Sequence, residues 1–353
     1  MRRRKRVWLV AAASAFALVA MACGGGGSEE DQGRSVVRFA FAPDPVFDWL
    51  NDQGIIPKIE DQWNVRLVTT ASWDEFSFFA GGHGDIVSMA TYETPLLEQE
   101  TDVKTVTFGQ YNNLRVPVFV QADSPYQTLE DLKGKTIGVP GPVSSTIVWG
   151  MFAKDWYGLD FCIERPDGSD CSDFDLREGD HFANMDLLLR GELDACVCIP
   201  EAAFPSLRTG EVRALYDPRS APWQLYEDEY ARGHKGLMGN NFVAREDWFN
   251  SHPDEVQFFL ALWERGLKEW EQHKTEIIRR YPQYFSVEDP KDVDYAIQYL
   301  EDYDWFVPTV YLSQDWVKDE LKVYDLMKKT GWMDQNAAIP RFEAVESEPP
   351  STG

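Results

Sequence analysis

The stretch from Arg115 to Gly150, RVPVFVQADSPYQTLEDLKGKTIGVPGPVSSTIVWG, predicts strands that alternate with helices. A β-branched and aromatic run over residues 116–122 indicates one strand, and residues 135–139 indicate a second. Between them the segment LEDLK predicts one short amphipathic turn of helix, which ends at Gly134. This alternation of strand, helix and strand is typical of an α/β fold.

A serine- and threonine-rich turn follows the second strand. Ser144, Ser145 and Thr146 come shortly after Gly141 and open a longer helix. Free N–H groups and the helix dipole favour an acceptor or an anion at a helix N-terminus, and glycine lets the backbone approach a ligand. An ordinary serine N-cap explains the same residues. The turn alone favours the cap, so a ligand role depends on the rest of the chain.

The whole stretch resembles a family of transport proteins. Ser124-Pro125, the segment LEDLKGK and the turn GPVSST together resemble the periplasmic solute-binding proteins of ABC importers, of the SsuA- and TauA-like sulfonate, nitrate and thiamine-precursor type. The segments GDI at 84–86 and LLRGELDA at 188–195 match the same family. The resemblance implies an α/β fold of the type II periplasmic binding protein class, with two lobes joined by two crossing strands.

The resemblance also implies the domain boundaries, and it covers the chain from Val36 to Met333. We expect a signal peptide at 1–22, a flexible tether at 23–35, a first lobe at 36–118 and 242–335, a second lobe at 119–241, and a disordered tail at 336–353.

The N-terminus predicts export. The basic run Arg2–Arg6 precedes an apolar run over residues 7–21 that is too short for a membrane span. The sequence Ala20-Met21-Ala22-Cys23 resembles a bacterial lipobox, although Ala20 stands where leucine is usual. We therefore expect a lipid on Cys23 that anchors the chain to the outer side of the cell membrane. The alternative is cleavage after Ala22 with Cys23 unmodified.

Composition and cysteine spacing limit the remaining classes of function. The net charge of -25 argues against binding nucleic acid or an anionic membrane through a general field. In an exported protein, Cys162 and Cys171 predict a disulfide across an acidic loop. Cys196 and Cys198 face the same side of a strand and are expected to be small buried residues rather than metal ligands. Whether these two are free stays open.

Further β-rich runs predict strands at 36–42, 65–70 and 85–90. Candidate ligand contacts lie where predicted strands end, because ligands of open α/β sheets bind outside the carboxyl ends of strands. The family resemblance places the same loops at its cleft. The candidates are Asp44, Phe47, Trp73, Thr91, Tyr92, Gln110, Ser144, Ser145, Thr146 and Glu201, with Asn240 and Asn241 near the hinge. For Asp44, a turn or helix cap is an equally common explanation.

The charges of these loops favour one class of ligand. No arginine or lysine occurs in the candidate loops, whereas Asp44, Glu93 and Glu201 make the cleft acidic. Aromatic side chains in the same loops suit a flat ring. The sequence therefore favours a neutral or cationic heteroaromatic ligand, such as an aminopyrimidine, over a sulfonate or similar small anion.

The expected function is that of a monomeric binding protein that closes on a solute and then docks on an ABC permease. A sensing protein with the same cleft is an alternative. A thiamine-pyrimidine synthase shares the fold, but its cysteine-rich motif and reactive histidine are not found here. With no catalytic set, nucleotide-binding motif or zinc spacing in the sequence, we expect no enzyme activity, no cofactor and no metal.

Overall fold

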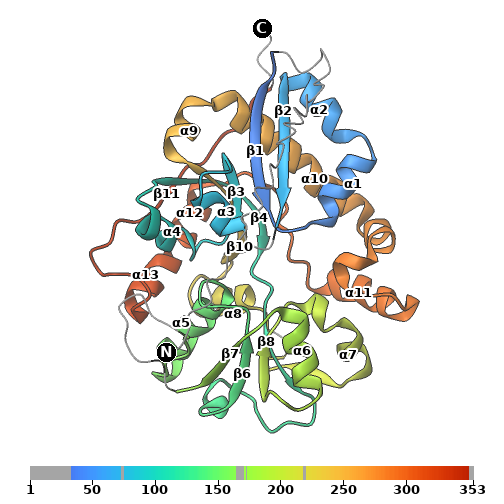
Figure 1. Ribbon diagram of the computed structural model, residues 1–353, viewed down its shortest axis with the longest axis vertical. Coiled ribbons are helices and arrows are strands. Elements are labelled where there is room, and N and C mark those ends of the chain that lie inside the picture. Colours follow the sequence, from blue (N-terminus) through green and yellow to red (C-terminus); the bar gives the residue numbers. More distant parts are fainter. Residues whose placement is uncertain (1–32, 73–74, 164–170, 172, 218–219, 350–353) are drawn as a thin grey trace, which may run out of the picture. The chain divides into compact units, whose positions relative to one another are not determined.

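The computed structural model describes residues 33–349, except for 73–74, 164–170, 172 and 218–219. The chain divides into two compact units, residues 1–34 and 35–353, and the fold described here is that of the second unit. It contains a six-stranded and a five-stranded sheet, each accompanied by helices (Figure 1). We call the larger sheet with its helices the first lobe and the smaller sheet with its helices the second lobe.

The first lobe is built on a mixed sheet in the order β11-β4-β10-β3-β1-β2. Strands β1 and β3 are parallel, and so are β1 and β2, whereas β10 runs antiparallel to both β3 and β4. The bounds are β1 Ser35–Phe41, β2 Val65–Ala71, β3 Ile86–Met89, β4 Thr105–Asn113, β10 Met238–Arg245 and β11 Arg341–Phe342. The strands predicted from the sequence at 36–42, 65–70 and 85–90 correspond to β1, β2 and β3.

Helices pack on this sheet through aromatic side chains. The long helix α10, Pro253–Arg280, contacts α1 and α2, and its Phe259 and Trp263 meet Phe39 of β1 edge to face. Such pairs add directional attraction to the burial of apolar surface. The other helices of this part are α1 Pro45–Asp52, α2 Ile55–Trp63, α3 Glu75–Ala80, α4 Thr94–Thr101, α9 Glu246–Ser251, η4 Pro282–Phe285, α11 Pro290–Asp302 and α12 Gln314–Glu320.

The second lobe has the strand order β7-β6-β8-β5-β9. Its strands are β5 Val118–Gln121, β6 Thr136–Val139, β7 Asp175–Glu178, β8 Ala195–Val197 and β9 Val212–Ala214, and its helices are η2 Glu130–Leu132, α5 Ser145–Tyr157, α6 His181–Leu189, η3 Pro200–Ala202, α7 Phe204–Thr209 and α8 Pro222–Glu229. The sequence pattern places β5, η2, β6 and α5 in the order that the structure has.

Two segments connect the lobes. The chain leaves the first sheet after β4 and returns to it at β10, and the N–H of Leu114 donates to the carbonyl of Leu237 at 2.9 Å where these segments pass each other. We call residues 114–117 the outgoing crossing and residues 234–238 the return crossing. Figure 1 shows the chain running from β4 down to the smaller sheet between the two lobes.

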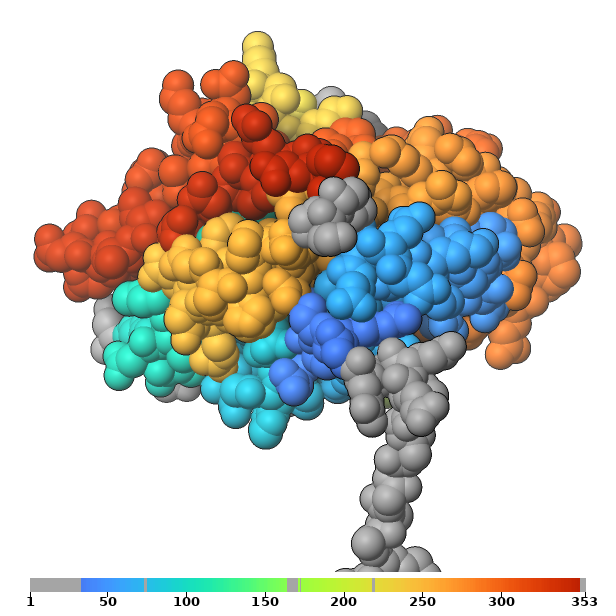
Figure 2. Space-filling model, turned by 90° about the horizontal axis from the view of Figure 1, so that it is seen from above, coloured from blue at the N-terminus to red at the C-terminus, as the bar shows by residue number. Residues whose placement is uncertain are grey.

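The C-terminal part of the chain touches both lobes. Helix α13, Lys322–Thr330, packs on α5 of the second lobe, where Gly150 leaves room for Trp332. The tail then adds β11 to the first sheet beside β4, and Arg341 pairs with Glu246 and Glu343. The expectation of disorder from residue 336 onward is therefore wrong at β11, because strand pairing and ion pairs fix this part of an otherwise acidic tail. Figure 2 shows blue N-terminal, orange and red C-terminal residues side by side on one face of the first lobe.

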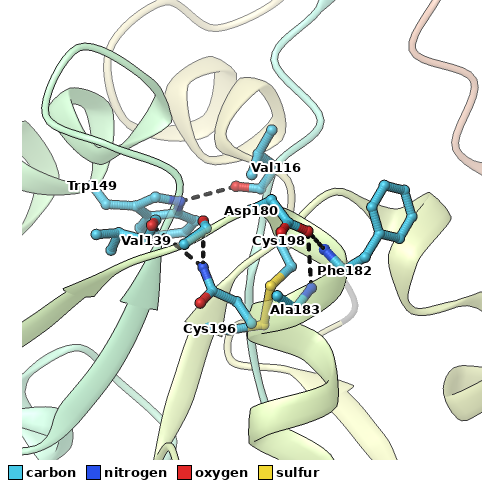
Figure 3. Close-up of a disulfide and its surroundings, with 10 residues drawn as sticks. Val116, Val139, Trp149, Asp180, Phe182, Ala183, Cys196 and Cys198 are labelled. Carbon is cyan, nitrogen blue, oxygen red and sulfur yellow. Dashed lines mark hydrogen bonds between the residues drawn. A yellow bond between two sulfur atoms is a disulfide. The ribbon is translucent and has the colours of Figure 1, made fainter. Parts of the chain in front are cut away.

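Both cysteine pairs within the described residues form disulfides. The predicted bond between Cys162 and Cys171 is present. Cys196 and Cys198 are also joined to each other across one intervening residue, and both are fully buried. Figure 3 shows this second disulfide beside the start of α6, with the ring of Phe182 pointing away from it. The shared orientation of the two cysteines was predictable, whereas their bond was not.

We expect the outer disulfide to contribute to stability. It spans nine residues, and the chain-entropy model assigns about 2–3 kcal/mol to closing a loop of that length. A Cys162→Ser/Cys171→Ser double variant should lose free energy of unfolding by that amount in urea titrations. Equal unfolding midpoints and slopes for the variant and the parent protein would contradict this expectation.

Candidate functional site

A cavity of about 480 Å³ lies between the two lobes. Its size falls within the range of roughly 300–1,000 Å³ typical of small-molecule sites. Side chains from both lobes and from the outgoing crossing line it: Pro43, Asp44, Pro45, Asn112, Arg115, Phe182, Ile199, Glu201, Gln283, Tyr284, Phe285, Ser286, Trp305 and Phe306. A smaller cavity of about 30 Å³ shares Pro43, Asp44, Asn112 and Arg115 with it.

Asp44 lies where β1 ends and α1 begins. Its Oδ1 accepts hydrogen bonds from the N–H groups of Val46 at 2.8 Å and Phe47 at 3.1 Å, so it caps the helix. Its Oδ2 accepts a hydrogen bond from the hydroxyl of Tyr111 at 2.9 Å. Burial raises the pKa of Asp44 to about 6, although these hydrogen bonds and the charge of Arg115 act in the opposite direction. The cavity therefore contains a carboxyl that titrates close to neutral pH.

Arg115 brings a positive charge into the cavity from the outgoing crossing. Its Nε donates to Glu201 Oε1 at 2.8 Å, a terminal nitrogen lies 2.7 Å from the same oxygen, and its guanidinium lies 4.7 Å from the ring centre of Trp305. The sequence-based expectation of a cleft without a basic side chain is therefore wrong. Arg115 lies past the end of β4, and only the fold brings it beside Glu201.

Two buried acceptors in this cavity have no donor among the described residues. They are Oε2 of Glu201 and Oδ1 of Asn112. Glu201 is only 4% exposed, and leaving a buried acceptor unpaired typically costs about 1–3 kcal/mol. A ligand that carries N–H or O–H donors would satisfy these oxygens where the side chains that cover them move aside.

The structure brings some of the sequence candidates together at the cavities. Asp44 and Glu201 line the larger one, and Asn240 lines the smaller one, where its amide donates to the hydroxyl of Ser88 at 2.7 Å. Trp73 lies outside the described residues.

Other candidates face the interior and do not line these two cavities. Phe47 packs between Phe41 and Trp263, and Tyr92 is buried in the hydrophobic cluster that contains α5. Gln110 donates to a backbone carbonyl at 3.5 Å. Thr91 and Asn241 are fully buried and bonded to each other.

The Ser-Ser-Thr turn has the geometry of a helix cap. The Ser144 hydroxyl donates to the carbonyl of Gly141 at 2.6 Å and accepts from the N–H of Thr146 at 3.2 Å. Thr146 is fully buried, and Ser145 is buried with no partner for its hydroxyl among the described residues. Local contacts therefore account for Ser144, and none of the three lines the cavities described above.

Glu93 does not make the cleft acidic as expected. Burial raises its pKa to about 8, opposed by a hydrogen bond from the N–H of Ala90 and assisted by the nearby charge of Glu75. Glu93 is therefore mostly protonated at neutral pH. Glu93 also lines neither of the two cavities, and the charged side chains of the larger cavity are Asp44, Glu201 and Arg115.

Two simple alternatives find no support in the described part of the chain. Among residues 33–349, apart from the four gaps, no three side chains of His, Cys, Asp or Glu are grouped to hold a metal ion. Within the same residues, no helix combines the length and the apolar character needed to cross a bilayer.

We expect Asp44 to make stability depend on pH. Between pH 4 and 6 the folded state retains a proton on Asp44 that an unfolded aspartate, with a pKa near 3.8, has released. The contribution of this proton to the free energy of unfolding is therefore fully present below pH 4 and is lost as the pH rises through 6. Asp44→Asn keeps a capping oxygen and removes the titration. Its melting temperature relative to wild type should therefore rise from pH 4 to pH 7 in calorimetric scans. A difference that does not vary with pH would show that Asp44 ionises normally.

Comparisons with known proteins agree with this two-lobed arrangement. The model of a family described as the periplasmic substrate-binding protein of phosphonate ABC transporters matches residues 39–218. No curated protein sequence matches the chain.

Solved structures show the same fold at low sequence identity. The aliphatic sulphonate binding protein SsuA of Escherichia coli is 14% identical, with 86% of this chain and 96% of that chain covered and a TM-score of 0.65. SsuA of Xanthomonas axonopodis pv. citri, bound to MOPS, is 14% identical over 88% and 99% of the two chains, with a TM-score of 0.63. A Candida albicans protein with the generic periplasmic binding protein fold is 13% identical over 89% and 97%, with a TM-score of 0.61. These likenesses confirm the type II two-lobed fold, and the family match over more than half of the sequence shows that the chain belongs to the phosphonate-type periplasmic substrate-binding proteins of ABC transporters.

Proposed function

We propose that this protein captures a small, flat molecule with N–H donors, either neutral or cationic, by closure of its lobes, and delivers it unchanged to an ABC permease. An aminopyrimidine is a representative ligand. The observation that carries the proposal is the pair of unpaired buried acceptors, Glu201 Oε2 and Asn112 Oδ1, in one cavity with the Asp44 carboxyl. The protein would act as a monomer, held to the outside of the membrane by lipid on Cys23.

The charges in the cavity favour a donor-bearing ligand over an anion. Arg115 is already bonded to Glu201, so an anion that takes Arg115 leaves a buried carboxylate without its partner. Breaking a buried ion pair in this way is strongly destabilising. An amine or amidine instead approaches Glu201 Oε2 and Asp44 while the ion pair stays intact.

A sulfonate or similar small anion is the second candidate. Two of the neighbouring structures described above are sulfonate-binding proteins, and one of them is bound to MOPS. Arg115 is the residue of the larger cavity that would bind such a group. This candidate requires Glu201 to move away from Arg115.

Phe182 supplies an accessible aromatic surface. It lines the cavity at the first turn of α6 and is 43% exposed, which is unusual for a phenylalanine in this chain. A flat ligand that stacks on it would cover apolar surface at no cost in core packing.

We expect Phe182→Ala to weaken ligand binding about tenfold or more without changing the melting temperature. Losing one stacking contact of roughly 1.5 kcal/mol corresponds to that factor. The ligand is first identified by thermal-shift screening against aminopyrimidines, aliphatic sulfonates, polyamines and urea, and its affinity is then measured by calorimetry. Phe182→Tyr should retain affinity, because it keeps the ring.

Ser145→Ala is the matched control for the location of the site. It removes a buried hydroxyl from the serine-threonine turn, so it should leave affinity unchanged if the ligand occupies the larger cavity. Loss of binding in Ser145→Ala with normal binding in Phe182→Ala would show that the ligand binds at the serine-threonine turn and not in the larger cavity. Stabilisation by sulfonates alone would favour the anion candidate, and recovery of a converted ligand would revive an enzyme function.

We also expect Cys23 to be lipidated. The basic N-terminus, the apolar run and the Ala22-Cys23-Gly24 junction support this prediction. A palmitate analogue fed to bacteria that express the full chain should label the wild-type protein and leave Cys23→Ala unlabelled. Equal labelling of both proteins would show that the lipid is absent from Cys23.

A further inference from the structure

A buried carboxylate from the C-terminal part of the chain reaches the return crossing. Glu320, the last residue of α12, is fully buried. Its Oε2 accepts hydrogen bonds from the N–H of Leu237 at 2.7 Å and lies 2.9 Å from Nε2 of His234. Its Oε1 accepts from the N–H of Met238 at 3.0 Å and from the hydroxyl of Thr91. One carboxylate thus binds three residues of the return crossing and the turn after β3.

The return crossing has a backbone shape that depends on this carboxylate. Leu237 has a φ of 58°, in the left-handed region that leucine rarely adopts. A side chain at Gly236 would meet the ring of His234 and the Glu320 carboxylate within 2.4 Å, so glycine is required there. Residues in such conformations persist only where surrounding contacts hold them. The hydrogen bond from Leu237 to Glu320 is one such contact.

The same carboxylate is connected to both crossings and, through Thr91, to Asn241 beside the smaller cavity. The carbonyl of Leu237 accepts a hydrogen bond from Leu114 in the outgoing crossing, so the two crossings are fixed together. Thr91 accepts a hydrogen bond from the amide of Asn241 at 2.9 Å, and Asn241 follows Asn240, which lines the smaller cavity.

We propose that Glu320 is a positioning residue that fixes the return crossing and thereby sets the angle at which the two lobes meet. This inference rests on the proposed function only in assuming that the lobes move about the crossings. Helix α12 comes some eighty residues after the return crossing, so a distant C-terminal segment fixes the conformation of the return crossing through hydrogen bonds. Removing the carboxylate would leave two buried backbone N–H groups and a buried hydroxyl without their acceptor.

Glu60 provides a matched control for a purely structural role. It is 3% exposed, and its Oε1 accepts a hydrogen bond from the backbone N–H of Leu67 at 2.8 Å, while Oε2 lies 3.4 Å from Arg66. Both carboxylates are therefore buried acceptors of backbone hydrogen bonds. Glu60 lies in α2 of the first lobe and contacts neither crossing in the hydrogen bonds of the described residues.

The test measures the distance between the lobes in the ligand-free protein. Spin labels are placed on exposed positions of each lobe, in a Cys23→Ala/Val68→Cys/Glu130→Cys background in which the other four native cysteines form their two disulfides. Pulsed electron resonance then gives the distribution of interlobe distances. We expect Glu320→Gln to broaden this distribution and shift it to longer distances, and Glu60→Gln to leave it unchanged even where both variants melt at lower temperature.

A wild-type distance distribution in folded Glu320→Gln would overturn the proposal, and so would an equal shift in Glu60→Gln. If Glu320→Gln does not fold, Glu320→Asp serves instead, because the shorter side chain withdraws the carboxylate from the N–H groups of Leu237 and Met238 while it keeps the charge. A wild-type distribution in Glu320→Asp then overturns the proposal, and a shifted one supports it. Because no ligand is added, the outcome is independent of whether the proposed ligand class is correct.

Discussion

The ion pair between Arg115 and Glu201 decides the chemistry of the space between the lobes. It joins the outgoing crossing to η3, which follows β8, and the ring of Trp305 covers the guanidinium. The buried charge of Glu201 is tolerated there because the half-buried Arg115 is its partner, and separating them would leave a buried carboxylate unpaired. Arg115 therefore binds Oε1 of Glu201 and leaves Oε2 without a partner among the described residues. For this reason the cavity offers hydrogen-bond acceptors even though it contains an arginine.

The lobes also meet outside the cavity. Arg208 of α7 pairs with Asp292 of α11, and Phe204 at the start of α7 packs on Tyr299 of α11 at 5.2 Å between ring centres. Phe204 is fully buried within the core cluster of the first lobe. Moving the lobes apart on this side would separate these contacts, so part of the free energy that holds the lobes together does not come from the ligand. The ligand shifts this equilibrium only by binding the closed arrangement more tightly than the open one.

Sequence patterns predicted the fold better than they predicted the site. Alternating apolar runs identified the first three strands of the first sheet and the β5-to-α5 order, because strand periodicity and turn residues are local properties. Trp305 lies in a loop after α11 and reaches the cavity only through tertiary packing, so no local pattern indicated it. Phe47 shows the opposite error, since the sequence predicts that it contacts the ligand and its ring lines neither of the two cavities. A ring beside a strand end can face a cleft or the core, and Phe47 packs on Trp263 of α10 in the core. The pairing of β11 was missed for the same reason, since its partner β4 is more than two hundred residues away.

Asp44 and Ser144 show which local signals can be trusted for binding sites. Both cap helices, as their sequence contexts predict, and capping competed with ligand binding as the explanation for each. In Ser144 the single hydroxyl is used twice, by Gly141 and by Thr146, so little capacity is left for a ligand. In Asp44 one carboxyl oxygen serves the cap, whereas the other is bonded only to Tyr111 and the residue lines both cavities. A cap and a ligand contact are therefore not alternatives for a carboxylate, because its second oxygen can serve the cleft while the first holds the helix.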